Sequence, residues 1–98
     1  MLIKIHKAYR DIVAVCVTEL LGKTFEEGDK ILEIRESFYN GEEIQEKELV
    51  DLLVDFAAED AIFNISGEKS VEAALKAGII KEEGIGKVQG IPFALVLI

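Results

Sequence analysis

Apolar and polar residues alternate along several short stretches of this chain, which is the pattern of β-strands. In residues 2–9, Ile3 and Ile5 alternate with Lys4 and His6, which predicts a strand with one face in water. Residues 11–17 are apolar on both faces and rich in β-branched side chains, which predicts a central strand covered on both sides. Three more stretches predict strands, at residues 30–35, 61–65 and 93–98.

Two other stretches have the periodicity of helices. In residues 46–60 a polar side chain recurs at every fourth position, which leaves one narrow polar stripe on an otherwise apolar helix. We therefore expect this helix to lie deep in the core. Residues 68–77 predict a second helix, which Ser66 would cap at its beginning and Gly78 would end.

These elements predict an α+β fold, with α/β as the alternative, in which a mixed sheet of about five strands packs against two main helices. The strand at 61–65, its helix and the final strand suggest a right-handed crossover between parallel strands. We expect that final strand to be central, because both of its faces are apolar. A chain of 98 residues has the size of one domain, which would span residues 1–98.

The net charge of −8 is concentrated in one segment. Residues 36–60 contain nine acidic residues and one basic residue, whereas acidic and basic residues balance on either side of this segment. Direct nucleic acid binding is not favoured, because phosphate contacts need a dominant basic surface. The chain lacks an apolar run of roughly 20 residues and a signal-peptide pattern, so we expect a cytoplasmic protein with no membrane contact.

Residues that could carry out catalysis are few. The one histidine, His6, alternates with apolar residues and is interpreted as a surface residue. The one cysteine, Cys16, lies among apolar residues and is interpreted as a buried, reduced thiol. One histidine and one buried thiol cannot build an ordinary zinc site or a nucleophile–base pair. We therefore expect no catalytic residue, no metal and no cofactor.

The tripeptide Gly22-Lys23-Thr24 matches the end of the phosphate-binding loop of many nucleotidases. The complete loop needs a glycine five residues before Gly22, and Val17 stands there. Gly22 is explained more simply as the residue that ends a short helical turn. The sequence therefore argues against a nucleotide site, although Lys23 and Thr24 stay candidates for contact with a partner or an anion because they lie in a turn.

Two further places could bind a ligand or a partner. Ser66 and Gly67 precede the helix at 68–77, and with Lys69 they could form an anion site at its N-terminus. An ordinary helix cap and a tight turn explain the same residues. Tyr39 lies beside an Asn-Gly turn, where an exposed aromatic side chain would suit partner recognition and a partly buried one would cap the sheet edge.

Four strings of sequence together resemble a known family. They are VCVTELLGKTFEEGDKILEI, SFYNGE, ISGEKSVEAALKAGII and GIP. In combination they are similar to a small archaeal family catalogued as domain of unknown function 424, and the resemblance covers nearly the whole chain. It implies a cytoplasmic archaeal protein with no assigned activity, and it supplies no mechanism.

The sequence favours a non-catalytic binding or interaction module, for which translation or RNA metabolism is one setting. Its acidic helix face, Asp51, Asp55 and Glu59, could steer a basic protein or a ribonucleoprotein toward it, or could simply keep the protein in solution. The alternative function is a small-molecule or anion-binding enzyme that uses the strand, turn and helix at 61–77. The sequence leaves the oligomeric state open.

Overall fold

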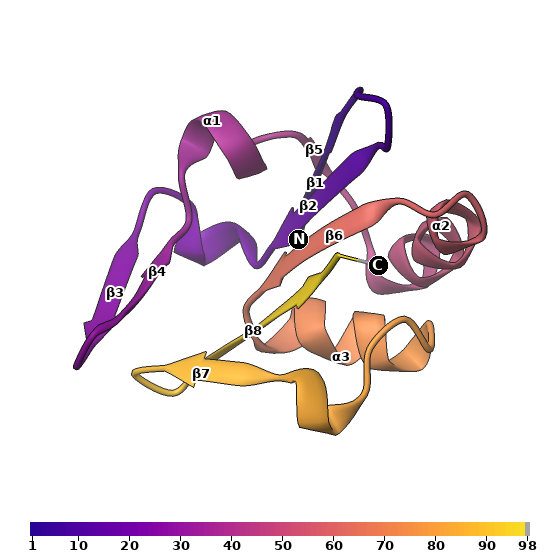
Figure 1. Ribbon diagram of the computed structural model, residues 1–98. Coiled ribbons are helices and arrows are strands. Elements are labelled where there is room, and N and C mark those ends of the chain that lie inside the picture. Colours follow the sequence, from indigo (N-terminus) through magenta and orange to yellow (C-terminus); the bar gives the residue numbers. More distant parts are fainter. Residues whose placement is uncertain (98) are drawn as a thin grey trace.

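Six strands form one mixed sheet in the computed structural model, which describes residues 1–97 (Figure 1). Their order across the sheet is β5-β1-β2-β6-β8-β7, and β2 and β6 are the parallel pair among antiparallel neighbours. The strands are β1 (Leu2–His6), β2 (Ile12–Cys16), β5 (Glu42–Glu43), β6 (Ile62–Ser66), β7 (Gly86–Val88) and β8 (Ile91–Val96). A separate hairpin consists of β3 (Thr24–Glu27) and β4 (Lys30–Glu33).

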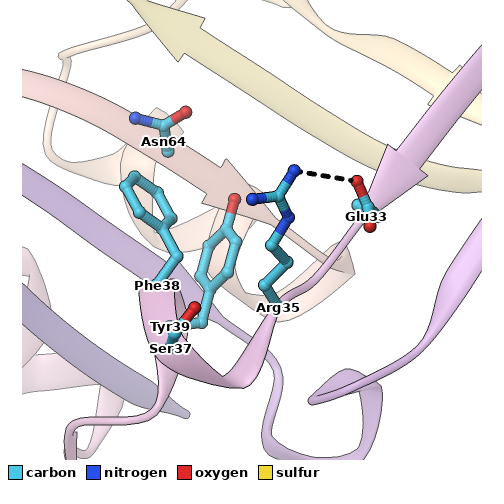
Figure 2. A pocket seen from close by; sticks show the side chains of 6 residues that line it. All are labelled: Glu33, Arg35, Ser37, Phe38, Tyr39 and Asn64. Atoms are coloured by element: carbon cyan, nitrogen blue, oxygen red, sulfur yellow. Dashed lines mark hydrogen bonds and ion pairs between the residues drawn. The ribbon is translucent and has the colours of Figure 1, made fainter.

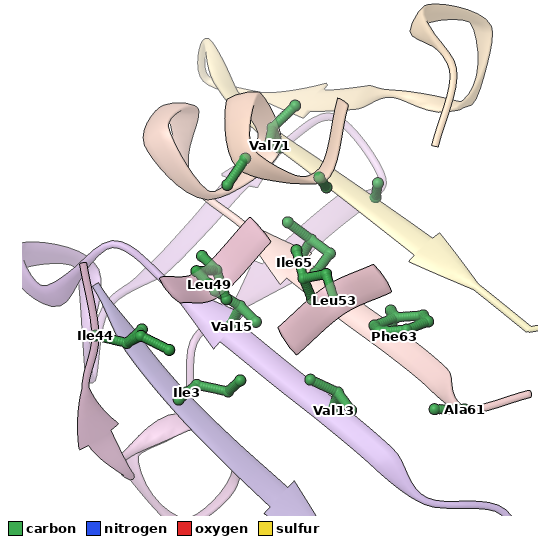
Figure 3. Close-up of a cluster of buried hydrophobic side chains, with 13 residues drawn as sticks. Ile3, Val13, Val15, Ile44, Leu49, Leu53, Ala61, Phe63, Ile65 and Val71 are labelled. Carbon is green, nitrogen blue, oxygen red and sulfur yellow. The ribbon is translucent and has the colours of Figure 1, made fainter. Parts of the chain in front are cut away.

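Two helices cover one face of the sheet (Figure 3). They are α2 (Glu46–Ala58) and α3 (Glu68–Lys76). Leu49 and Leu53 of α2 are completely buried against valine and isoleucine side chains of β2 and β6. The two helices are joined at the surface by an ion pair of 2.7 Å between Lys76 Nζ and Glu46 Oε1.

The opposite face of the sheet, which we call the outer face, is covered only in part. The short helix α1 (Glu36–Tyr39) lies against β1 and β2 on this face, and the β3–β4 hairpin lies beside it, against β7. Gln89 holds the hairpin down, because its backbone N–H donates to Glu27 Oε1 and its side-chain amide to the Glu26 carbonyl. Leu95 of β8 lies on the part of the outer face that α1 and the hairpin leave uncovered, and it is 53% exposed.

The central strand is confirmed. Val13, Ala14, Val15 and Cys16 of β2 are all fully buried, since helices cover one face of the strand and α1 with the hairpin covers the other. The α+β class, the mixed sheet and the two main helices are confirmed as well. Three strands that the pattern did not predict, β3, β5 and β7, are short, and β3 and β5 consist largely of glutamate.

The predicted parallel crossover to the final strand is wrong. β8 runs antiparallel to β6, because the chain first forms β7 and then reverses at Gln89 and Gly90. Both turn residues have positive φ, 51° and 77°, which is the conformation of a two-residue hairpin turn that suits the twist of the strands. The reversal therefore depends on a tight turn rather than on a crossover helix.

The last strand is central in the order of the sheet, since β8 lies between β6 and β7. The two neighbours overlap at one position: β7 pairs with residues 91–93 and β6 with residues 93–96, so Phe93 is paired on both sides and residues 94–96 have no partner in β7. Leu97 follows the strand, and the predicted last strand residue, position 98, lies outside the described residues.

The expectation that the helix at 46–60 lies deep in the core is also wrong. Only Leu49 and Leu53 of α2 are fully buried, while Val54 is 48% exposed and Ala58 is exposed. The helix forms an outer layer on one face of the sheet, so one side of it contacts the core and the other contacts water. None of the helices in residues 1–97 is long and apolar enough to cross a membrane.

Candidate functional site

A pocket of about 310 Å³ opens on the outer face of the sheet (Figure 2). It lies between α1, the end of β4 and the middle of β6, so three segments far apart in the sequence form its wall. Its lining residues are Glu33, Arg35, Ser37, Phe38, Tyr39 and Asn64.

The alternation of a strand places Asn64 in this pocket. Phe63 and Ile65 of β6 belong to the core under the helices, so Asn64 between them points to the outer face. Its register partners in the same row are Ala14 of β2 and Leu95 of β8, both apolar. Among the described residues, the Asn64 amide makes no side-chain hydrogen bond, although it is partly buried. It is therefore a polar group that has donors and acceptors available for a ligand.

The charged side of the pocket is formed by Arg35 and Glu33. Arg35 Nη2 lies 3.3 Å from Glu33 Oε1, and both side chains are largely exposed, at 68% and 48%. An exposed pair of this kind contributes little to stability, since water screens both charges. Most of the Arg35 guanidinium therefore remains able to bind an anion.

Tyr39 and Ser66 meet at the floor of this site. The Tyr39 hydroxyl and Ser66 Oγ share a buried hydrogen bond of 3.0 Å. Burial raises the pKa of the Tyr39 hydroxyl, and the bond to Ser66 opposes that increase in part. Two residues that the sequence singled out separately are thus partners. However, the Tyr39 side chain is only 6% exposed. Of the two interpretations of Tyr39, the exposed side chain that recognises a partner is therefore wrong.

Changing Tyr39 to phenylalanine removes one partner of this buried bond. We expect Tyr39→Phe to lower the free energy of unfolding by about 1–3 kcal/mol, because Ser66 would keep a desolvated hydroxyl with no partner. Urea unfolding measures the change. The matched control is Tyr9→Phe, because Tyr9 is fully exposed and the same substitution there should change stability by less than about 0.5 kcal/mol. Equal effects of the two substitutions would contradict a structural bond at Tyr39.

His6 is not the free surface residue that the pattern indicated. Its Nε2 donates a hydrogen bond of 2.9 Å to the Phe38 carbonyl, and its ring stacks on Phe38 with 4.7 Å between ring centroids. Lys4, two residues earlier on the same face of β1, donates to the Ser37 carbonyl at 2.9 Å. Carbonyls near the end of α1 lack partners within the helix, so these two side chains attach α1 to β1. They thereby hold Phe38 in the wall of the pocket.

Cys16 lies beneath the pocket, in register with Ser66 on the neighbouring strand. Burial raises the pKa of the Cys16 thiol to about 11, and the positive chain terminus offsets part of that rise. The thiol therefore stays protonated at neutral pH, which is unsuited to nucleophilic attack because the thiolate is the reactive form. Within residues 1–97, no group of three or more histidine, cysteine, aspartate or glutamate side chains is close enough to hold a metal ion.

The structure separates the other predicted anion-site residues. Ser66 does not cap α3, because its hydroxyl points to Tyr39 on the outer face, and Gly67 occupies the N-cap position instead. Lys69 lies on the helical side of the sheet, where it borders a hollow with Met1 and Glu72. The proposed trio of Ser66, Gly67 and Lys69 therefore does not form one site around the N-terminus of α3.

Lys23 and Thr24 have exposed side chains at the root of the β3–β4 hairpin. The backbone of this tripeptide is engaged with the chain after β4. Gly22 N–H donates to the Ile34 carbonyl at 2.7 Å, and Ile34 N–H donates to the Lys23 carbonyl at 2.9 Å. The tripeptide therefore closes the hairpin. In a phosphate loop the backbone amides would point at the ligand, whereas here the Gly22 amide is hydrogen-bonded to Ile34.

The acidic residues of α2 form an exposed stripe. Asp51, Asp55 and Glu59 are all exposed, and Glu48 precedes them at helical spacing. Beside this stripe, a groove of about 380 Å³ runs between the edge of β1, β5 and α2. Its lining is apolar at Ile3, Ile5, Ile44 and Leu52, acidic at Glu42, Glu43 and Glu48, and basic at Lys4, whose ammonium group donates to the Ser37 carbonyl of α1. We call this feature the acidic groove.

Arg35, Asn64 and the acidic groove were not predicted from the sequence. One signal for Asn64 was available, because it is the one polar residue inside the apolar string AIFNI. Nothing local in the sequence places Arg35 opposite it, since the approach of β4 to β6 depends on how the hairpin folds over the sheet.

The fold and the pocket define a class of protein: a small α+β domain whose mixed sheet has helices on one face and a ligand-sized pocket on the other. The chain belongs to the family of proteins of unknown function named DUF424, whose family model matches residues 6–98. The resemblance found in the sequence is thereby confirmed. No curated protein matches the chain.

The chain is also similar to a solved structure, the crystal structure of an uncharacterized conserved protein from Methanopyrus kandleri. The TM-score is 0.85 and the sequence identity is 25%, with 97% of this chain and 88% of that chain covered. The match supports the same fold over nearly the full length of the described chain.

Proposed function

We propose that this protein is a non-catalytic interaction module that binds an extended, basic segment of a macromolecular partner in the acidic groove. The observation that carries this proposal is the groove itself, in which carboxylates border an apolar floor along an incompletely covered sheet edge. A proteinaceous partner with alternating basic and apolar residues would satisfy both parts of this lining.

The charges beside the groove are available to a partner. Of the acidic residues in segment 36–60, only Glu46 takes part in an ion pair within residues 1–97. Glu42, Glu43, Glu48 and Asp51 are exposed and have no such partner among the described residues. Unpaired charges of one sign on one side of a protein accelerate association with a partner of the opposite sign.

The backbone of β1 supports binding of the partner as an added strand. β5 pairs only with Leu2 and Ile3. The Ile44 N–H donates to the Met1 carbonyl, so the backbone groups of Met1 face β5. Every second residue of a strand faces the same edge, so the N–H and C=O of Ile5 also face the β5 side of β1, beyond the point where β5 ends. An unpaired strand edge is a template for a further strand. A basic protein of a ribonucleoprotein particle has the required chemistry, whereas nucleic acid itself would be repelled by the carboxylates.

A defined peptide tests this function. A fluorescent peptide that alternates lysine with valine should bind the wild-type protein, and its affinity should fall as salt is raised because salt screens exposed charges. The double variant Glu48→Lys/Asp51→Lys should lose binding. The matched control Glu82→Lys/Glu83→Lys makes the same charge change on an exposed turn outside the groove and should retain binding. The acidic groove would be refuted as the site if the two variants bound the lysine–valine peptide equally well. It would also be refuted if the wild-type protein bound a glutamate–valine peptide as well as the lysine–valine peptide.

A further inference from the structure

We propose that the pocket in Figure 2 binds the carboxylate of a ligand that carries an apolar group next to that carboxylate. Neither the family nor the solved relative assigns a ligand to this chain. The pocket shares no lining residue with the acidic groove, so this inference is independent of the proposed function.

Arg35 supplies the charge that a carboxylate needs. A guanidinium binds a carboxylate with two parallel N–H donors, which gives both strength and orientation. The bond of 3.3 Å that Nη2 makes to Glu33 is long for a charge-assisted hydrogen bond. This bond to Glu33 uses one nitrogen of the Arg35 guanidinium. A ligand can therefore accept from the other N–H donors of the guanidinium, or it can displace Glu33.

Asn64 supplies a second donor on the other side of the pocket. Figure 2 shows its amide across the pocket from the Arg35 guanidinium, with the Tyr39 ring between them. Asn64 is partly exposed, so its amide is accessible from the pocket, and a bound carboxylate would accept a hydrogen bond from its NH₂ group. The Tyr39–Ser66 bond fixes the floor beneath that position.

The surface next to Asn64 is apolar and uncovered. Leu95 is its register partner on β8 and is 53% exposed. Ile62 lies two residues away on the same face of β6 and is partly buried. The Phe38 ring forms the adjoining wall. A ligand whose carboxylate reaches Arg35 and Asn64 would therefore place an aliphatic or aromatic body over Leu95 and Ile62.

Glu33 argues for a carboxylate over a phosphate. A phosphate dianion would add two negative charges to the one on Glu33, and one guanidinium would have to compensate all three. A carboxylate brings only one negative charge, and where it displaces Glu33 from Arg35 it takes over the pairing of one guanidinium with one carboxylate. The volume of about 310 Å³ is at the small end of ligand pockets, which suits a short acid or the terminal residue of a chain.

The test uses two probes that carry the same chemistry. One is 4-methylpentanoate, which stands for a free metabolite, and the other is a short peptide ending in leucine with a free carboxylate. Each is titrated into the full chain while the Asn64 side-chain amide and the Arg35 Nε–H are followed by NMR. We expect saturable shifts of these two signals, and no such shifts with the corresponding amides, 4-methylpentanamide and the C-terminally amidated peptide.

Variants connect the shifts to the pocket. Arg35→Gln should weaken binding about tenfold or more, because it removes a charge-assisted pair. Asn64→Asp keeps the shape of the side chain and should also weaken binding, because it adds a like charge. The matched control Lys30→Gln removes a positive charge at the start of β4, the strand that precedes Arg35, and should bind as the wild type does.

Tighter binding of the peptide would assign the site to a chain terminus, and tighter binding of 4-methylpentanoate would assign it to a metabolite. Both results support carboxylate recognition. Equal binding of acids and amides, unchanged binding by Arg35→Gln, or a preference for inorganic phosphate would overturn it. The variant Glu48→Lys/Asp51→Lys should leave carboxylate binding unchanged, so failure of the groove and failure of the pocket are distinguishable.

Discussion

Replacing Leu53 with alanine is expected to lower the free energy of unfolding by about 2–5 kcal/mol. Leu53 is completely buried, and it lies between α2 and the sheet among the side chains of Val15, Phe63 and Ile65. Alanine would remove the hydrophobic transfer energy of the lost methyl groups and leave a cavity that the close-packed layers can only partly fill.

Chemical denaturation of the purified variant measures this loss. The neighbouring residue offers the matched control, because Val54 is 48% exposed on the flank of the helix, at the rim of a hollow that Phe63 and Ala77 also line. Val54→Ala should cost less than about 1 kcal/mol, since most of its surface is already in contact with water. A loss below about 0.5 kcal/mol for Leu53→Ala would show that the core contact between α2 and the sheet is wrong.

Replacing Gly67 with alanine is expected to cost about 2–5 kcal/mol, from two separate causes. Gly67 has φ 99° and ψ 156°, a backbone conformation that is essentially restricted to glycine. A Cβ atom at this position would also lie 2.5 Å from Val17 Cγ2 and 3.0 Å from Leu20 Cδ1. The substitution therefore strains the backbone and overfills the junction between β6 and α3.

A double variant separates the two causes. Val17→Ala should relieve the collision in Gly67→Ala and recover part of the lost stability, whereas the backbone strain should remain. The matched control is Gly84→Ala, because Gly84 has no positive φ and a Cβ there would meet nothing within 4 Å. It should change stability by less than about 0.5 kcal/mol. Equal costs at the two glycines would contradict the structure at the β6–α3 junction.

The junction at Gly67 also matters for the pocket. Ser66 immediately precedes it, and the Gly67 N–H donates to the Pro92 carbonyl at 2.8 Å. These contacts fix the end of β6, from which Ser66 reaches Tyr39 on the outer face. A side chain on Gly67 is thus expected to disturb the pocket floor as well as the helix that follows.

The elements that the sequence predicted correctly are those whose signal is local. β2 is recognisable because a short apolar run rich in β-branched residues is typical of a strand that is covered on both faces. The two main helices are recognisable from periodicity along a single segment. β5 could not be recognised, since two glutamates have no strand propensity of their own and pair with β1 because the chain passes beside it.

The burial of each helix face could not be read from periodicity alone. The apolar residue Val54 is 48% exposed because it borders an unfilled hollow beside Ala77 and Val96. The direction of β8 likewise depends on the turn at Gln89 and Gly90. Gln89 adopts a positive φ there, although glutamine has no marked preference for that conformation. Its side chain and backbone hold the β3–β4 hairpin, so the turn and the hairpin stabilise each other.

The sequence by itself determined the family, the fold class, the central strand, the two helices and the concentration of negative charge in one segment. Only the tertiary structure decided that His6 attaches α1 to the sheet, that Tyr39 bonds Ser66, and that Arg35 faces Asn64 across a pocket. The physical reason is the range of the interactions. Periodicity and composition act within a segment of a few residues, whereas a pocket forms where segments distant in sequence pack together, and packing depends on the whole core.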